Sequence, residues 1–127
     1  MLVPVNVRRR ERSTTLSDNI LLTIAVVGGT GQEGSGLAMR WVRSGYRVVV
    51  GSRDEMRAKE RAAELNEILG ERGLILGAEN SAAVREADLV VLTVPYEAQK
   101  ETLTALRAEL DGKILVSVVV PMQPDHF

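Results

Sequence analysis

A glycine-rich loop near the start of the chain restricts the possible folds more than any other feature of the sequence. Residues 28–34 read Gly-Gly-Thr-Gly-Gln-Glu-Gly, so that Gly29, Gly31 and Gly34 match the pattern G-x-G-x-x-G. A largely apolar run, residues 21–27, precedes the loop, and a segment with helical periodicity follows it. In this context Gly29 allows a tight turn, Gly31 lets the backbone approach a pyrophosphate, and Gly34 allows close packing of helix on strand. The loop therefore predicts a dinucleotide site at a helix N-terminus; the alternative is that the glycines serve only the turn and the helix contact.

Short β-rich runs alternate with helical segments along the rest of the chain. We expect strands at residues 21–27, 47–50, 74–76, 88–94 and 113–120. We expect helices at residues 31–44, 54–69, 81–86 and 96–110. This alternation is typical of an α/β fold, here a Rossmann-type doubly wound parallel sheet of five strands. Because crossovers are right-handed, the simplest strand order is 3-2-1-4-5.

The end of the second expected strand indicates which dinucleotide binds. An NAD-binding fold usually has an acidic residue there, roughly 20 residues after the loop, to hold the ribose 2′-hydroxyl. This sequence has Ser52 and Arg53 instead, 18 and 19 positions after Gly34. Their hydroxyl and guanidinium suit a 2′-phosphate, and Arg57 follows one helical turn later, so we expect NADP, provided that the carboxylate of Asp54 points away. Helix capping by Ser52 and Asp54, with Arg57 on an exposed helix face, is the simpler interpretation of the same residues.

A second segment follows the fourth expected strand, at the same edge of the sheet. In an open α/β sheet the ligand crevice lies outside the carboxyl ends of the strands, where the strand order reverses. Contact with the nicotinamide half of the cofactor is therefore one interpretation of this segment, which consists of Thr93, Val94, Pro95 and Tyr96. Plain termination of the strand, with the proline in the first turn of the next helix, explains it equally well.

Cysteine is absent and histidine occurs once, at position 126, which removes most protein-based catalytic chemistry. Disulfides, thiolate catalysis and Cys-ligated metal are excluded, and neither a His-based metal site nor a His-based triad is expected. Residues 96–100 spell Y-x-x-x-K, the acid/base pair of short-chain dehydrogenases, but they stand too close behind the glycine loop for that role. We expect no metal site and no catalytic side chain, so the chemistry belongs to a cofactor.

The charges nearly cancel, with 16 Lys and Arg against 17 Asp and Glu. This balance argues against a dedicated nucleic-acid-binding protein. No stretch approaches the ~20 apolar residues that span a membrane. Residues 20–27 follow several arginines but lack the cleavage site of a signal peptide. We therefore expect a cytoplasmic protein whose partners are small molecules, without nucleic acid or membrane.

The length of 127 residues suits one domain. We expect a flexible basic tail at residues 1–19, an NADP-binding Rossmann domain at residues 20–122, and a C-terminal tail at residues 123–127.

Several segments together resemble one known family. They are residues 24–31 (Ile-Ala-Val-Val-Gly-Gly-Thr-Gly), 49–53 (Val-Val-Gly-Ser-Arg) and 92–95 (Leu-Thr-Val-Pro), with Val-Ser at 116–117 and Val-Pro at 120–121. This combination is similar to the N-terminal domain of the NADPH-dependent reductases of the deazaflavin coenzyme F420. The resemblance covers about residues 22–122, nearly all of the expected folded part.

The resemblance implies NADP(H) as cofactor and the deazaflavin coenzyme F420 as co-substrate, with reversible hydride transfer between nicotinamide C4 and deazaflavin C5. It implies that the pyrophosphate is wrapped by Thr30, Gly31, Gln32 and Glu33. It implies that the 2′-phosphate is held by Ser52, Arg53 and Arg57, and that the 93–96 segment lies near the nicotinamide. Catalysis is then the alignment of two rings that carry their own redox chemistry.

Two features depart from the family's pattern. Glu33 stands where the family usually has an apolar residue, and the chain ends just after the fifth expected strand. Family members continue into a helical part that closes the deazaflavin site and forms a homodimer. Two alternatives therefore stay open, namely a module that only binds or senses NADP, as in atypical short-chain dehydrogenase relatives, and a truncated subunit that needs a partner chain.

Overall fold

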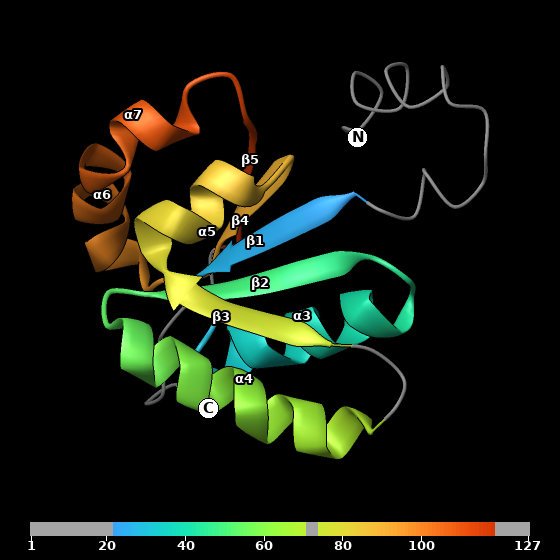
Figure 1. Cartoon of the computed structure of the whole chain (residues 1–127). Helices are drawn as coiled ribbons and strands as arrows, with labels where there is room; N and C mark the ends of the chain where they lie inside the picture. The colour runs from blue at the N-terminus through green and yellow to red at the C-terminus, as the bar shows by residue number, and fades with distance from the viewer. Residues whose placement is uncertain (1–21, 71–73, 119–127) are drawn as a thin grey trace, which may run out of the picture.

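Five parallel strands form the centre of the computed structural model, which describes residues 22–70 and 74–118 (Figure 1). The strands are β1 (Thr23–Val27), β2 (Arg47–Ser52), β3 (Ile75–Glu79), β4 (Leu89–Leu92) and β5 (Ile114–Ser117). They are hydrogen-bonded in the order β3-β2-β1-β4-β5, and every pairing is parallel. The expected α/β class and strand order are confirmed. The two expected tails and His126 lie outside the described residues.

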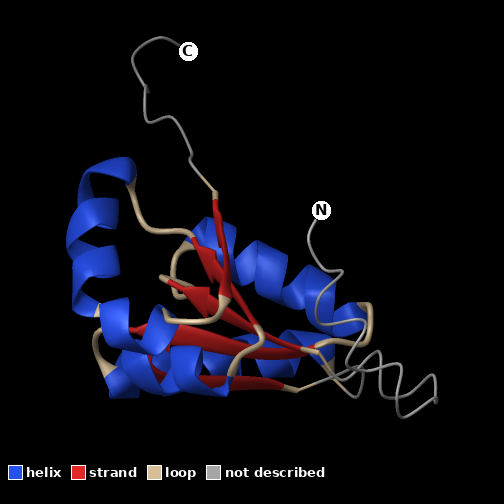
Figure 2. Cartoon of the chain, turned by 90° about the horizontal axis from the view of Figure 1, so that it is seen from above, coloured by secondary structure: helices blue, strands red, loops and turns tan. Residues whose placement is uncertain are grey.

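Helices cover both faces of the sheet (Figure 2). They are α3 (Gln32–Arg43), α4 (Glu55–Leu69), α5 (Asn80–Glu86), α6 (Tyr96–Ala105) and α7 (Arg107–Leu110). Successive strand residues face opposite sides, so that Val26 and Val50 pack with α3 and α4, while Val27 and Val49 pack with α5 to α7. Because both faces are covered, β1 is buried at every position. Within the described ranges no helix is long and apolar enough to cross a membrane.

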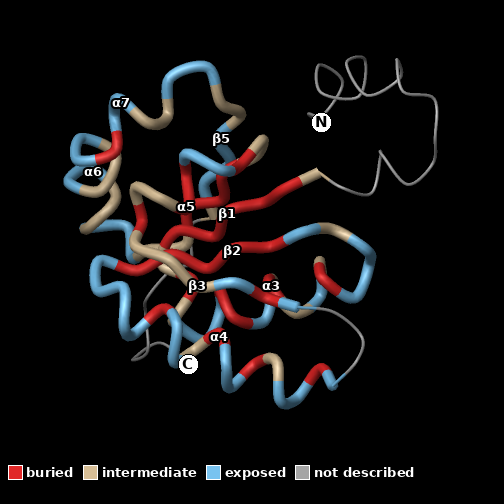
Figure 3. The backbone as a smooth tube through the Cα atoms, in the orientation of Figure 1, coloured by how far each residue is buried: buried red, intermediate tan, exposed pale blue. Residues whose placement is uncertain are grey.

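Burial falls from the middle of the sheet towards β5. The buried positions gather along β1 and β2, whereas β5 carries exposed positions (Figure 3). Leu115 and Val116 in β5 are 40% and 37% exposed although they face opposite sides of the sheet. The ends of β1 and β2 therefore lie in the most deeply buried part of the sheet.

Two strands are longer than expected. β2 continues through Gly51 and Ser52, and β3 continues from Ile75 to Glu79. The sequence analysis missed the second half of β3 because Gly, Ala and Glu are poor strand formers. Gly77 is nevertheless required there, since a Cβ at this position would collide with the backbone carbonyl of Ala58 in α4.

The helix expected at residues 96–110 is two helices, divided at Leu106. This side chain turns into the core, where it is 3% exposed. The hydroxyls of Thr102 and Thr104 donate to the carbonyls of the residues four positions earlier, at 2.8 and 2.9 Å, and such bonds bend helices. β4 ends earlier than expected, at Leu92, and β5 ends at Ser117; residues 119 and 120 of the expected fifth strand lie outside the described residues.

Candidate dinucleotide-binding site

Three predicted segments meet at the carboxyl edge of the sheet. The carbonyl of Gly51, near the end of β2, accepts hydrogen bonds from the backbone N–H groups of Gly28 and Gly29, both at 3.1 Å. After β4, Thr93 donates its backbone N–H to the carbonyl of Val27 at 3.0 Å. The glycine loop thus lies between the ends of β2 and β4, where the strand order reverses and open α/β sheets bind ligands.

Gly28 and Gly29 both belong to the tight turn of the loop, in which the N–H of Gly29 donates to the carbonyl of Val26 at 3.1 Å. Gly28 has φ +81°, a left-handed conformation that side chains disfavour. Gly29 has a different reason to be glycine, because a Cβ there would lie 2.8 Å from the carbonyl oxygen of Val26 and 2.9 Å from Cβ of Val50. Gly29 therefore lies in the turn, and the close approach of the loop to β2 is what excludes a side chain there.

The other two glycines of the pattern differ in what surrounds them. A Cβ at Gly34 would lie 2.6 Å from Cα of Gly29 and 2.9 Å from Oγ1 of Thr93, so the helix packs directly on the loop. A Cβ at Gly31 would meet only the carbonyl oxygen of Gly28, at 3.8 Å. The space in front of Gly31 is therefore open, and a phosphate group fits the cradle that a side chain there would fill.

The N-terminus of α3 is left uncapped. Gly31 is its N-cap residue, and no side chain bonds to the first N–H groups, which have no partner inside an α-helix. Across residues 22–70 and 74–118, no hydrogen bond has the Thr30 N–H as donor. Gln32 and Glu33 in the first turn are exposed. These free N–H groups and the positive end of the helix dipole can receive an anion.

The predicted 2′-phosphate residues lie where β2 ends and α4 begins. Ser52 is 9% exposed, and its Oγ accepts the N–H of Asp54 at 3.1 Å. The carboxylate of Asp54 accepts the N–H groups of Met56 and Arg57 at 3.0 and 3.4 Å, so Asp54 caps α4. The guanidinium groups of Arg53 and Arg57 belong to exposed residues. Asp54 is thus turned towards its own helix, as the expectation for NADP requires.

The segment after β4 divides into two parts. Thr93 donates its hydroxyl to the carbonyl of Val27 at 2.8 Å, and Cγ1 of Val94 lies 2.8 Å from where a Cβ of Gly28 would be. These two residues therefore pack on the glycine loop. Pro95 is the N-cap residue of α6, and Tyr96 follows it with 70% exposure. Strand termination and proximity to the loop both hold for this segment.

Two buried polar residues at the site were missed by the sequence analysis. Ser35, 4% exposed in α3, donates its hydroxyl to the carbonyl of Gly29 at 3.0 Å. Asn80, 7% exposed, has a buried Oδ1 without a hydrogen-bond partner among the described residues. This oxygen lies 2.6 Å from where a Cβ of Gly51 would be. No sequence signal marks either residue, because both contacts are made across the fold.

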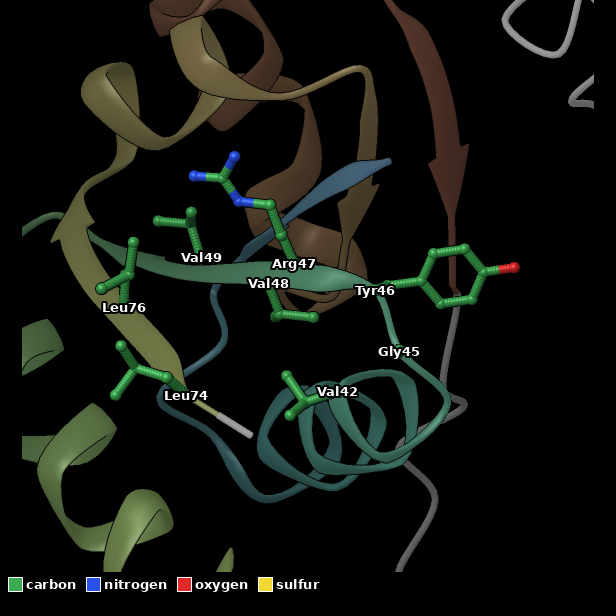
Figure 4. Close-up of a pocket in the computed structure, with 8 residues that line it drawn as sticks. All are labelled: Val42, Gly45, Tyr46, Arg47, Val48, Val49, Leu74 and Leu76. Atoms are coloured by element: carbon green, nitrogen blue, oxygen red, sulfur yellow. The ribbon is translucent and has the colours of Figure 1, made fainter. Parts of the chain in front are cut away.

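A cavity of about 360 Å³ lies elsewhere, at the amino ends of β2 and β3 (Figure 4). Its lining is mainly apolar and includes Val42, Val48 and Leu74. None of the predicted binding segments reaches it, because those segments lie at the carboxyl ends of the strands. The described part of the chain also contains no cluster of three or more His, Asp or Glu side chains placed to hold a metal ion.

The doubly wound parallel sheet and its glycine loop define a Rossmann-type nucleotide-binding domain. The chain belongs to the family described as "NADP oxidoreductase coenzyme F420-dependent", whose model matches residues 23–121. The resemblance noted in the sequence is thereby confirmed.

Relatives in this family are considerably longer than the chain. The F420-dependent NADP reductase of Methanocaldococcus jannaschii is 43% identical over 104 residues, which are 80% of this chain and 46% of that protein. The enzyme of the same name from Methanothermobacter thermautotrophicus is 42% identical over 81% of this chain and 45% of its own length. The chain thus spans about half the length of these relatives.

Solved structures agree with this family and fold. A candidate F420-dependent NADP reductase from Arthrobacter sp. FB24 superposes with a TM-score of 0.66 at 31% identity, over 83% of this chain and 48% of that one. A lactate dehydrogenase from Cryptosporidium parvum reaches a TM-score of 0.65 at 16% identity, over 80% of this chain and 38% of that one. The second likeness shows the fold alone.

Proposed function

We propose that the chain binds NADP(H) at the carboxyl edge of its sheet and is the NADP-binding domain of an oxidoreductase that exchanges hydride with the deazaflavin coenzyme F420. The observation that carries this proposal is the uncapped N-terminus of α3 behind an open glycine loop, in a member of this family. The names of the relatives support both coenzymes.

The pyrophosphate lies, in this proposal, against the backbone N–H groups of Thr30, Gln32 and Glu33, since the N–H of Gly31 donates to the carbonyl of Gly28 at 3.3 Å. Gly31 leaves room for close approach, and the helix dipole favours the negative charge. Glu33 contributes its N–H group while its exposed side chain stays in solvent. Binding through the backbone explains why this position tolerates a carboxylate.

The 2′-phosphate lies beside Ser52 and Arg53. Because Oγ of Ser52 accepts the N–H of Asp54, its hydroxyl proton is directed elsewhere and can be donated to a phosphate oxygen. Arg53 supplies a charge-assisted bond, and Arg57 adds a second positive charge from the first turns of α4. The carboxylate of Asp54 caps α4 and is therefore turned towards the helix.

The nicotinamide lies next to residues 93–96, with Thr93 and Val94 as the wall against the glycine loop. The bound coenzymes supply the redox chemistry, a hydride passing between nicotinamide C4 and deazaflavin C5. The chain binds and orients the nicotinamide, and none of its side chains is needed as nucleophile, acid or base.

We further propose that the protein is cytoplasmic, forms a homodimer and binds no nucleic acid.

Binding is tested by calorimetric titration of the protein with NADPH and, in parallel, with NADH. We expect NADPH to bind at least about ten-fold more tightly, the size of one charge-assisted hydrogen bond. Equal affinities would contradict the assignment of Ser52 and Arg53 to the 2′-phosphate.

Hydride transfer is tested separately, by mixing protein, NADPH and oxidised deazaflavin without oxygen and following the deazaflavin absorbance. Transfer supports an oxidoreductase in this chain. Tight NADPH binding without transfer in either direction would restrict the chain to binding NADP(H).

A further inference from the structure

Arg61 in α4 reaches across to α3, beneath the glycine loop. Its Nε donates to Oγ of Ser35 at 3.1 Å, a contact between residues 26 positions apart. Its Nη1 donates to Oε1 of Glu64 at 2.8 Å, and its side chain is 32% exposed. Two nitrogens of the guanidinium group, Nε and Nη1, are therefore hydrogen-bonded, and the partner of Nε is the hydroxyl of a buried residue.

The contact from Arg61 fixes the direction in which Ser35 donates. An Nε–H group can only donate, so Oγ of Ser35 must accept there, which leaves its own proton for the carbonyl of Gly29. A hydroxyl that accepts from a charged donor is polarised and donates more strongly. The three groups thus form one directed chain from α4 to the glycine loop.

The hydrogen bond at the Gly29 carbonyl also sets the direction of the next N–H group. In a planar trans peptide, the carbonyl of Gly29 and the N–H of Thr30 point in opposite directions. Ser35 draws this carbonyl towards α3, so the Thr30 N–H points away from Ser35. The N–H of Gly29 itself is held by the carbonyls of Val26 and Gly51, both at 3.1 Å.

We propose that Arg61 and Ser35 are positioning residues that aim the Thr30 N–H at the cofactor pyrophosphate. The inference rests on the proposed function, since the pyrophosphate is part of both NADPH and NADH. Arg61 therefore acts on a group that the two cofactors share, whereas Arg53 acts on the 2′-phosphate that only NADPH carries. The two arginines of the same region are distinguishable by which cofactor each affects.

The test measures the dissociation constants of both cofactors for Arg61→Met, Ser35→Ala and the double variant. We expect each single change to weaken NADPH and NADH by the same factor, about three- to ten-fold, the size of one net hydrogen bond. The double variant should lose no more than the larger single change, because both break one chain. Unchanged affinities, a loss confined to NADPH, or additive losses would overturn the proposal.

Lys59→Met is the matched control. It removes a cation from the same helix and breaks the ion pair between Lys59 and Glu55, but it touches neither Ser35 nor the loop. Glu64→Gln removes the negative charge from the second partner of Arg61 and leaves the contact with Ser35 in place. Both variants should bind the two cofactors as the unchanged protein does; a loss as large as that of Arg61→Met would assign the effect to helix charge.

A measurement without cofactor separates this proposal from the proposed function. In the cofactor-free protein, backbone NMR order parameters at residues 29–31 should fall in Arg61→Met and Ser35→Ala, while those of β2 and β3 stay unchanged. Unaltered values at Thr30 would overturn the positioning role even if NADPH binds. Failure of the unchanged protein to bind either cofactor would instead refute the proposed function, and altered values at Thr30 would still support the local geometry.

Discussion

The N-termini of α3 and α4 lie at the same edge of the sheet, yet they are finished in opposite ways. α4 begins behind Asp54, whose carboxylate accepts the N–H groups of Met56 and Arg57. α3 begins behind Gly31, and no side chain caps it. A side-chain cap is worth about 0.5–2 kcal/mol relative to Ala but only about a few tenths of a kcal/mol relative to Gly, so α3 forgoes a little stability that α4 has.

The surroundings of the two helix starts explain this difference. The loop before α3 is hydrogen-bonded on the side of the sheet and of α3, by the carbonyl of Gly51 and the hydroxyl of Ser35. The side facing Gly31 stays open. An uncapped helix start that is otherwise tightly held is the arrangement expected when an external anion completes the cap.

Adding a side-chain cap to the N-terminus of α3 should have the largest effect on cofactor binding. Gly31→Asp would supply the cap that α4 has, and φ −78° with ψ 173° suits an N-cap residue without strain. We expect NADPH affinity to fall about 100-fold or more, because a carboxylate about 4 Å from a phosphate costs roughly 4 kcal/mol at an intermediate dielectric. The free energy of unfolding should stay equal or rise by about a few tenths of a kcal/mol.

Calorimetry with NADPH and thermal denaturation measure the two effects separately. Gly36→Ala is the matched control, because a Cβ there meets nothing within 4 Å and the position lies inside α3. This variant should gain about 0.5–1 kcal/mol of stability and keep its affinity. An affinity of Gly31→Asp close to that of the unchanged protein would mean that the cradle does not hold the phosphates.

Removing the positive charge of Arg53, beside the capped N-terminus of α4, should have the next largest effect on NADPH binding. Arg53→Ala should weaken NADPH about 10- to 100-fold, the range for hydrogen bonds to charged groups, and leave NADH unchanged. Parallel titrations with both cofactors check this. Arg43→Ala removes an exposed arginine from the last turn of α3, away from the site, and should change neither. Equal losses for both cofactors would place Arg53 outside the 2′-phosphate pocket.

Features set by neighbouring residues were predictable from the sequence. The five strands, their order and the glycine loop follow from apolar runs, glycine spacing and the handedness of crossovers. The capping role of Asp54 was among the interpretations of its local sequence because helix N-terminal signals are local as well.

Features set by contacts between distant elements were not predictable. The sequence pattern assigned the turn to Gly29, but it did not show that Gly28 takes the left-handed conformation or that Gly29 closely approaches Val50 in β2. The strand continues through Gly77 because it pairs there with Val50 of β2, and α4 leaves no room for a side chain at this position. The link from Arg61 to Ser35 joins two helices whose packing no local pattern reports.

The smallest expected effect concerns the charge of the cap itself. Asp54→Asn keeps a good N-cap but removes a carboxylate beside Arg53, so NADPH should bind about two- to five-fold more tightly, within the range of exposed charge pairs. The free energy of unfolding should hardly change, whereas Asp54→Ala should lower it by about 1 kcal/mol. Chemical denaturation and NADPH titration of the two variants check this, with NADH as the control cofactor. Tighter binding of NADH by the same factor would show that the carboxylate acts on the whole site, and equal destabilisation by Asn and Ala would show that capping of α4 needs the charge.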